Sequence, residues 1–149
     1  MQEPAKKSGT AYKKTLWYAL IVICSLVCLH VPAFAQDTAG MPAMQWMNSV
    51  AAAINQHTPV QIDSYTRLDS VQVMDAHTFL YNYTLSGVDT NNAKIVAYLK
   101  QALKQQTLQN YKTNPSMAEI RKHNLRLGYN YRDAQGKSII AFAINPADF

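Results

Sequence analysis

The stretch LRLGYNYRDAQGKSIIAFAIN, residues 125–145, decides how this chain folds. Apolar and polar residues alternate over 125–132, which is the period-two pattern of a strand with one buried face. The next segment, DAQG at 133–136, suits a tight turn, since Asp favours its first position and Gly supplies a positive φ. The chain then returns through Lys137–Asn145, which is apolar at successive positions. The stretch therefore predicts a hairpin whose second strand is either covered on both faces or central in its sheet.

A second hairpin is expected earlier in the chain. Val60–Met74 reads as a strand, but the parity of its apolar residues changes near Arg67–Ser70, which indicates a bulge or a bend. Thr78–Leu85 alternates as the returning strand, and Asp75–His77 forms the turn between them.

Helices are expected around the two hairpins. The first covers 42–56, with Pro42 at its first position. The second covers Lys94–Tyr111, and Asp89–Asn91 offers its cap. The third is a short helix within Asn114–Asn124. A hairpin cannot bury one face alone, so the two should share a sheet. The order of elements predicts an α+β fold, with a four-stranded, mainly antiparallel sheet and the helices on one face. Residues 42–149 are expected to form one domain.

The first 35 residues have the order of an export signal. Basic residues come first, the apolar run Leu16–Val31 follows, and Ala33–Ala35 offers the small residues that a signal peptidase needs. We expect cleavage after this site, a flexible leader at 36–41, and a periplasmic or secreted protein. The alternative is an uncleaved inner-membrane anchor formed by residues 16–35, because the run is almost long enough to span a bilayer. After cleavage, no membrane span is expected.

Charge and cysteine content exclude several classes of function. The whole chain has a net charge of +5, but residues 36–149 keep only ten Lys or Arg against eight Asp or Glu, a net of +2. This value gives no case for nucleic-acid binding. Cys24 and Cys28 both lie in the apolar run, so the exported part should have no disulfide, no thiol nucleophile and no Cys-ligated metal.

No catalytic motif is present, and we expect a protein that is not an enzyme and holds no cofactor or metal. The chain has no G-x-S-x-G elbow, no S-x-x-K motif and no glycine-rich phosphate loop. His57, His77 and His123 sit at predicted turns or helix ends, without the spacing of metal ligands. A small hydrolase with a site assembled from Asp and His side chains is the alternative. Its carboxylates would be Asp63, Asp69, Asp75 and Asp89.

Two groups of side chains are candidates for binding. An aromatic row on the strands could be a ligand-binding surface, but aromatic pairing under the helices is the preferred interpretation. The row consists of Phe79, Tyr81, Tyr83, Tyr129 and Tyr131. A basic cluster could contact an acidic partner or a lipid head group, although a solvated helix end also explains it. The cluster consists of Arg121, Lys122, Arg126 and Arg132.

Two stretches follow a recognisable layout, 59–85 (PVQIDSYTRLDSVQVMDAHTFLYNYTL) and 114–148. The markers of the second are Pro115, Met117, Tyr129, Tyr131, Asp133, Gly136, Ile144 and Asp148. The layout resembles small exported bacterial proteins of unknown role, and the nearest named group is the quorum-sensing-regulated virulence factor family. The resemblance carries over no catalytic residue. It implies that relatives often place cysteines where this chain has Asn114 and Phe149, so that a disulfide found there is missing here.

Together these features predict a small exported binding or interaction module. Its partner would be a protein or an envelope component. The alternatives are the small hydrolase and a role in envelope assembly.

Overall fold

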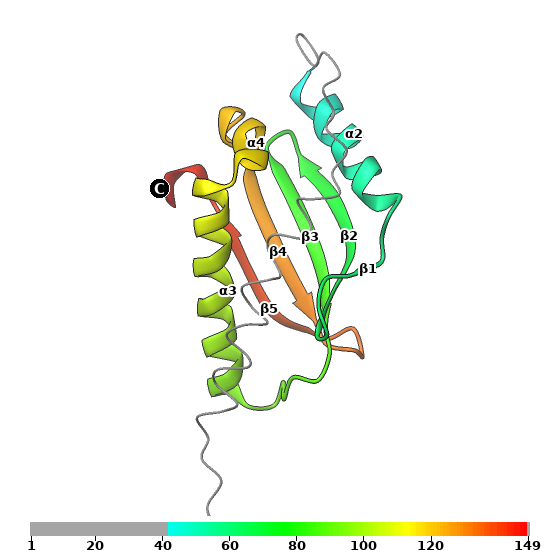
Figure 1. Ribbon diagram of the computed structural model, residues 1–149, viewed down its shortest axis with the longest axis vertical. Helices are drawn as coiled ribbons and strands as arrows, with labels where there is room; N and C mark the ends of the chain where they lie inside the picture. Colours follow the sequence, from blue (N-terminus) through cyan, green and yellow to red (C-terminus); the bar gives the residue numbers. More distant parts are fainter. Residues whose placement is uncertain (1–41, 149) are drawn as a thin grey trace, which may run out of the picture.

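The computed structural model describes residues 42–148, which form one mixed five-stranded sheet with helices packed against it (Figure 1). In chain order the helices and strands are α2 (Ala43–Asn55), β1 (Val60–Gln61), β2 (Thr66–Asp75), β3 (Thr78–Leu85), α3 (Ala93–Thr113), α4 (Ala118–Lys122), β4 (Arg126–Arg132) and β5 (Ser138–Ile144), and short 3₁₀ turns occupy Pro115–Met117 and Pro146–Asp148. The strands lie in the order β1-β2-β3-β4-β5, and every pair is antiparallel except β3–β4. The predicted α+β class with a mainly antiparallel sheet is confirmed.

The predicted export signal, 1–35, and leader, 36–41, lie outside the described residues, as does Phe149. The predictions made for them stay predictions, and so do the boundaries 42–149 of the single domain. Within residues 42–148, no helix is both long enough and apolar enough to cross a bilayer.

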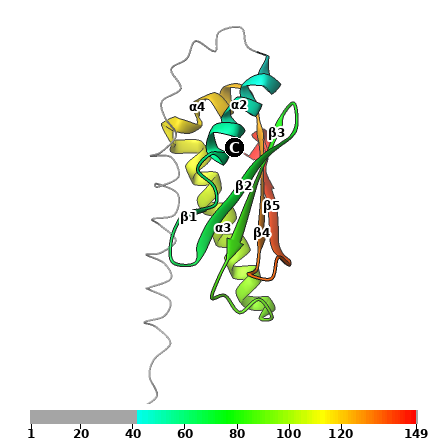
Figure 2. The ribbon, with the colours of Figure 1, turned by 90° about the vertical axis from the view of Figure 1, so that its right-hand side faces the viewer.

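All the helices lie on one side of the sheet (Figure 2). Helix α2 packs over β2 and buries Met47 and Ala51. Helix α3 packs over β5 and buries Leu99 and Leu103. The two long helices therefore cover opposite edges of the sheet. No element within the described residues covers the other side, which we call the open face (Figure 2).

The outer edge of β2 is protected by two short interactions. Strand β1 pairs with Arg67 and Leu68, and it raises the number of strands from the predicted four to five. Further along, the Asn55 side-chain amide donates to the Val71 carbonyl at 2.7 Å and accepts from the Val71 N–H at 2.8 Å. One side chain of α2 thus makes the pair of hydrogen bonds that another strand would make. The sequence predicted a single strand over Val60–Met74, whereas the structure turns between Gln61 and Thr66 and divides this stretch into β1 and β2.

The structure confirms two of the three local features that the sequence predicted at a bulge, a helix end and a helix cap. A register shift between Leu68 and Ser70 places a β-bulge where the change of parity predicted one. Asn124 ends α4 with a φ of 52°, in the left-handed region that Asn tolerates. The cap of α3 differs from the prediction, since Asn92 rather than a residue of Asp89–Asn91 accepts the N–H groups of the first turn.

Strand β5 is an edge strand, so the prediction that 137–145 forms a central strand is wrong. Strand β4 is central instead, because it pairs with β3 on one side and with β5 on the other. The apolar character of β5 comes from α3, which packs along it and helps to bury Ile144, whereas Ala141 is exposed. Phe142 is only half buried, and its ring stacks on that of Tyr129 with centroids 5.1 Å apart.

Two leucines on the central strands test the assignment of the two faces. Leu127 of β4 is fully buried on the helix side, whereas Leu80 of β3 is half exposed on the open face. Leu127→Ala should lower the free energy of unfolding by about 2–5 kcal/mol, the usual cost of emptying a buried leucine site. Leu80→Ala should cost about 1 kcal/mol or less. Urea melts measure both, and equal losses would contradict an uncovered face.

Candidate interaction site

The tyrosines of β3 and β4 lie on the helix side of the sheet. The parallel register sets Tyr81 beside Tyr129 and Tyr83 beside Tyr131. In these two pairs the rings are stacked with centroids 5.4 and 4.8 Å apart, and all four residues are buried. Phe142 of β5 extends the stack. The preferred interpretation, aromatic pairing under the helices, is confirmed, and these rings do not form an exposed ligand surface.

The open face carries a ladder of polar side chains that crosses four strands. The side-chain amide of Asn82 on β3 donates to the Ser70 hydroxyl at 3.3 Å, and that of Asn130 on β4 donates to Oδ1 of Asn82 at 3.2 Å. The Ser138 hydroxyl then donates to Oδ1 of Asn130 at 2.9 Å. These groups satisfy one another, so the ladder first of all fixes the register of the strands.

An ion pair lies beside this ladder. Arg67 donates to Asp69 at 2.6 Å, and the Thr84 hydroxyl donates to the same carboxylate at 2.6 Å. Arg132 of β4 stands next to Thr84 in the sheet register. The open face is therefore polar and flat here, and its charges are partly balanced.

The four residues of the predicted basic cluster do not form one patch. Arg126 and Arg132 lie at opposite ends of β4, about 20 Å apart at the rise of a strand. Lys122 pairs with Glu119 at 3.2 Å on the exposed side of α4. Arg121 is half buried, and its partners are backbone carbonyls. The structure therefore separates these side chains, and whether any of them contacts a partner stays a prediction.

Arg121 joins α4 to the end of α3. Its Nη1 donates to the carbonyl of Tyr111 at 2.5 Å and to the carbonyl of Asn114 at 3.0 Å. These carbonyls lie at the C-terminal end of the helix, where a cation is favoured. Burial raises the pKa of the Tyr111 phenol, and the nearby Arg121 charge partly opposes this shift.

Arg121 and Lys122 form a matched pair of substitutions. Arg121→Ala should lower the free energy of unfolding by about 1.5–3 kcal/mol, because it removes charge-assisted hydrogen bonds to half-buried carbonyls. Lys122→Ala should cost about 0.5 kcal/mol or less, since its ion pair is exposed. Thermal melts of the two variants measure this difference. If Arg121→Ala melts like the wild type, Arg121 has no structural role, and this result would favour the predicted contact with a partner.

Arg126 stands at the other end of the open face, near the β2–β3 turn. Its backbone N–H donates to the His77 carbonyl at 2.7 Å. In the turn, the Asp75 carboxylate accepts the His77 N–H at 2.8 Å. This hydrogen bond, with a smaller one from Thr78 and weaker attraction to His77 and Arg126, lowers the pKa of Asp75. The ionised carboxylate is therefore the form that holds the turn.

The lowered pKa of Asp75 makes a prediction about acid. The ionised carboxylate contributes stability above 3.8, the ordinary pKa of Asp, and this contribution is lost as the pH falls through the lower folded value. The difference in unfolding midpoint between wild type and Asp75→Ala should therefore be largest near neutral pH and shrink below the ordinary value. Urea melts across this range measure it. A difference that is independent of pH would show that the charge of Asp75 plays no part.

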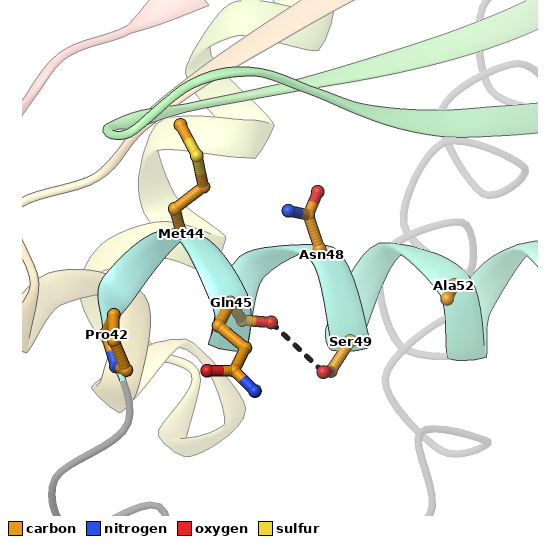
Figure 3. A pocket seen from close by; sticks show the side chains of 6 residues that line it. All are labelled: Pro42, Met44, Gln45, Asn48, Ser49 and Ala52. Atoms are coloured by element: carbon orange, nitrogen blue, oxygen red, sulfur yellow. Dashed lines mark hydrogen bonds between the residues drawn. The ribbon is translucent and has the colours of Figure 1, made fainter.

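The outward face of α2 differs from the other helix surfaces of the described residues in carrying no charge. The helix has no charged residue between Ala43 and Asn55. Met44 is 46% exposed, and it lies on the rim of a shallow, open depression along the helix (Figure 3). The depression is lined by Pro42, Met44, Gln45, Asn48, Ser49 and Ala52. We call this surface the α2 face.

The side chains of the α2 face project in two rows. Figure 3 shows Met44 and Asn48 on one side of the helix and Gln45 and Ser49 on the other, where the Ser49 hydroxyl donates to the Gln45 carbonyl at 3.0 Å. Small side chains such as Ala52 leave the helix backbone accessible to a partner. Sequence reasoning missed this face, although the signal was present as a helix of 13 residues without charge.

The described residues hold no group of three His, Cys, Asp or Glu side chains that could bind a metal ion. His57 and His77 are exposed at turns. His123 packs against the Trp46 ring, with centroids 5.4 Å apart, and its Nε2 lies 3.6 Å from Glu119. This histidine thus contacts α2 and the acidic residue of α4.

The chain belongs to a family of unknown role. Residues 43–141 match the model described as "Domain of unknown function (DUF8479)", and this match covers more than half of the chain. No match was found among curated proteins.

Solved structures share the fold at low sequence identity. A candidate secreted protein, PA3611 of Pseudomonas aeruginosa, has a TM-score of 0.57 at 10% identity, over 73% of this chain and 96% of its own. EpsS, the pilotin of the Vibrio vulnificus type 2 secretion system, has a TM-score of 0.54 at 13% identity, over 70% and 88%. AspS, a type II secretion system pilotin of Vibrio cholerae, has a TM-score of 0.53 at 12% identity, over 72% and 91%. At such identities the likeness shows the fold alone.

Proposed function

We propose that this protein is a small, exported, non-enzymatic module that binds a protein of the cell envelope through the α2 face. The observation that carries the proposal is the missing charge on an exposed helix. Charged residues are depleted and Met is enriched at the cores of protein interfaces. The α2 face shares two of these features, since it carries no charged residue and Met44 is exposed on it.

The fold supports a partner in the envelope. Two of the similar structures are pilotins of type II secretion systems, and a third is a candidate secreted protein. This likeness favours a periplasmic or secreted location, and it favours an assembly role over hydrolysis. Residues 1–35 would be a cleaved signal, or residues 16–35 would stay as an inner-membrane anchor. Membership of the quorum-sensing-regulated virulence factor family stays a prediction.

The α2 face is suited to a helical or extended segment rather than to a small molecule. The depression is shallow, and no charged group lines it. A small ligand needs a concave site that encloses most of its surface and a few well-placed polar groups. A segment laid along α2 could instead pack on Met44 and hydrogen-bond to Asn48.

Site-specific photo-crosslinking in the producing cell tests this proposal. A photoreactive residue at Asn48 should give a covalent adduct of discrete mass with an envelope protein. The same residue at Gln72, which is exposed on the open face, should give none. Met44→Asp should remove the adduct at Asn48 without lowering the melting temperature, because Met44 is exposed and a charge in the interface core is costly.

The proposal is wrong if adducts at positions 48 and 72 are equally frequent. It is also wrong if Met44→Asp leaves the adduct at Asn48 intact. A charge at Ser49, as in Ser49→Lys, provides a second variant on the same face. It should act like Met44→Asp.

A further inference from the structure

The outer side of α3 carries positive charge only. Between Ala93 and Thr113 the helix has four lysines and no Asp or Glu. The lysines are Lys94, Lys100, Lys104 and Lys112, and all four are exposed. The described ion pairs join Arg67 to Asp69 and Glu119 to Lys122 and His123, so none of them involves α3.

Helical geometry gathers most of this charge on one side. At 3.6 residues per turn, Lys94, Tyr98 and Lys112 point away from the side of α3 that is buried, whereas Lys104 lies about 80° around the helix from Lys94 and Lys112. Tyr98 is 54% exposed. Lys94 and Lys112 are about 27 Å apart along the axis at the rise of an α-helix. We call this surface the α3 face.

The neutral residues of the α3 face are Gln101 and Gln105, which are also exposed. The outer strip therefore carries Lys94 and Lys112 near its two ends, with neutral Tyr98, Gln101 and Gln105 between them and Lys104 on its flank, and it has no negative charge. Surface helices commonly mix the two signs of charge, which form pairs at i and i+4. Helix α3 has no acidic residue that could form such a pair, which indicates an anionic contact outside the chain.

We propose that the α3 face lies on an anionic phospholipid surface. A helix side is convex and can rest along a flat bilayer. Lysines on long stems suit dispersed head groups, whereas recognition of single carboxylates favours the planar fork of Arg, which α3 lacks. The exposed Tyr98 ring has the amphipathic character found at bilayer interfaces. The apolar run Leu16–Val31 would bring the chain to a membrane, either during export or as an anchor.

The α3 face is separate from the α2 face. The two helices lie over opposite edges of the sheet, with α2 on β2 and α3 on β5 (Figure 1). Contact with lipid through α3 would therefore leave α2 free for a partner. The two proposals rest on different residues, and each can fail without the other.

A fluorescent label on the α3 face tests the lipid contact in the full-length chain. The chain carries Gln101→Cys as its single thiol, because Cys24→Ser and Cys28→Ser remove the two natural cysteines. An environment-sensitive dye is attached to this thiol. The chain is mixed with phosphatidylcholine vesicles, with or without about 30 mol% phosphatidylglycerol. A chain labelled at Gln72→Cys on the open face is the control. An apolar anchor would bring both labels near the bilayer, but only contact through the α3 face would place the label at position 101 on the lipid surface.

We expect a blue shift of the label at position 101 that requires phosphatidylglycerol and disappears in roughly 0.5 M salt, which screens such contacts. The label at position 72 should not respond. Replacing Lys94, Lys104 and Lys112 by Gln should weaken the lipid-dependent response roughly ten- to a hundredfold in lipid concentration. A control that removes the same charge elsewhere, Lys122→Gln with Arg132→Gln and Lys137→Gln, should keep most of it.

Three results would overturn the proposal. One is an equal response with pure phosphatidylcholine, and another is an equal loss in the two triple variants. The third is a response to soluble polyglutamate without a response to vesicles, which would assign the α3 face to an acidic protein.

Discussion

The parallel pairing of β3 with β4 is the constraint on which the rest of the structure depends. Two parallel strands need a crossover connection, and α3 with α4 supplies it. The pairing also sets the rows of side chains across the centre of the sheet. On the helix side it stacks Tyr81 on Tyr129, and on the open face it joins Asn82 to Asn130. Aromatic and amide contacts thus fix the same register from opposite faces.

The crossover also places the helices. Because α3 must return the chain past the sheet to the start of β4, it lies over the β5 edge, while α2 covers β2 and bonds to the edge through Asn55. Each long helix needs only one side for packing, so its other side remains in solvent. The two candidate interaction surfaces are these outer sides. Their positions follow from the topology, whereas their chemistry is set by side chains that do not affect folding.

Local rules predicted most of the elements, and long-range pairing explains the misses. The bulge near Ser70 and the left-handed Asn124 follow from neighbouring residues, and the burial of the aromatic row follows from alternation along β3 and β4. The edge position of β5 and the parallel pairing of β3 with β4 depend on which strands are neighbours in the sheet. Alternation of apolar and polar residues along one strand does not show which strand lies beside it. For the site, the sequence showed the charge of Arg121 but not its carbonyl partners on α3. The uncharged α2 could have been noticed from composition alone.

The contrast between α2 and α3 is the strongest argument that the domain contacts two different surroundings. A helix that meets only water does best with mixed charges, which favour solubility and give small stabilising pairs. Helix α2 has no charge at all, and α3 has four lysines without one acidic residue. Neither composition improves packing, since Met47 and Leu103 already fill the core beneath them. The two proposals account for this contrast, since each assigns one helix to its own contact: a protein partner at the α2 edge and an anionic lipid surface at the α3 edge.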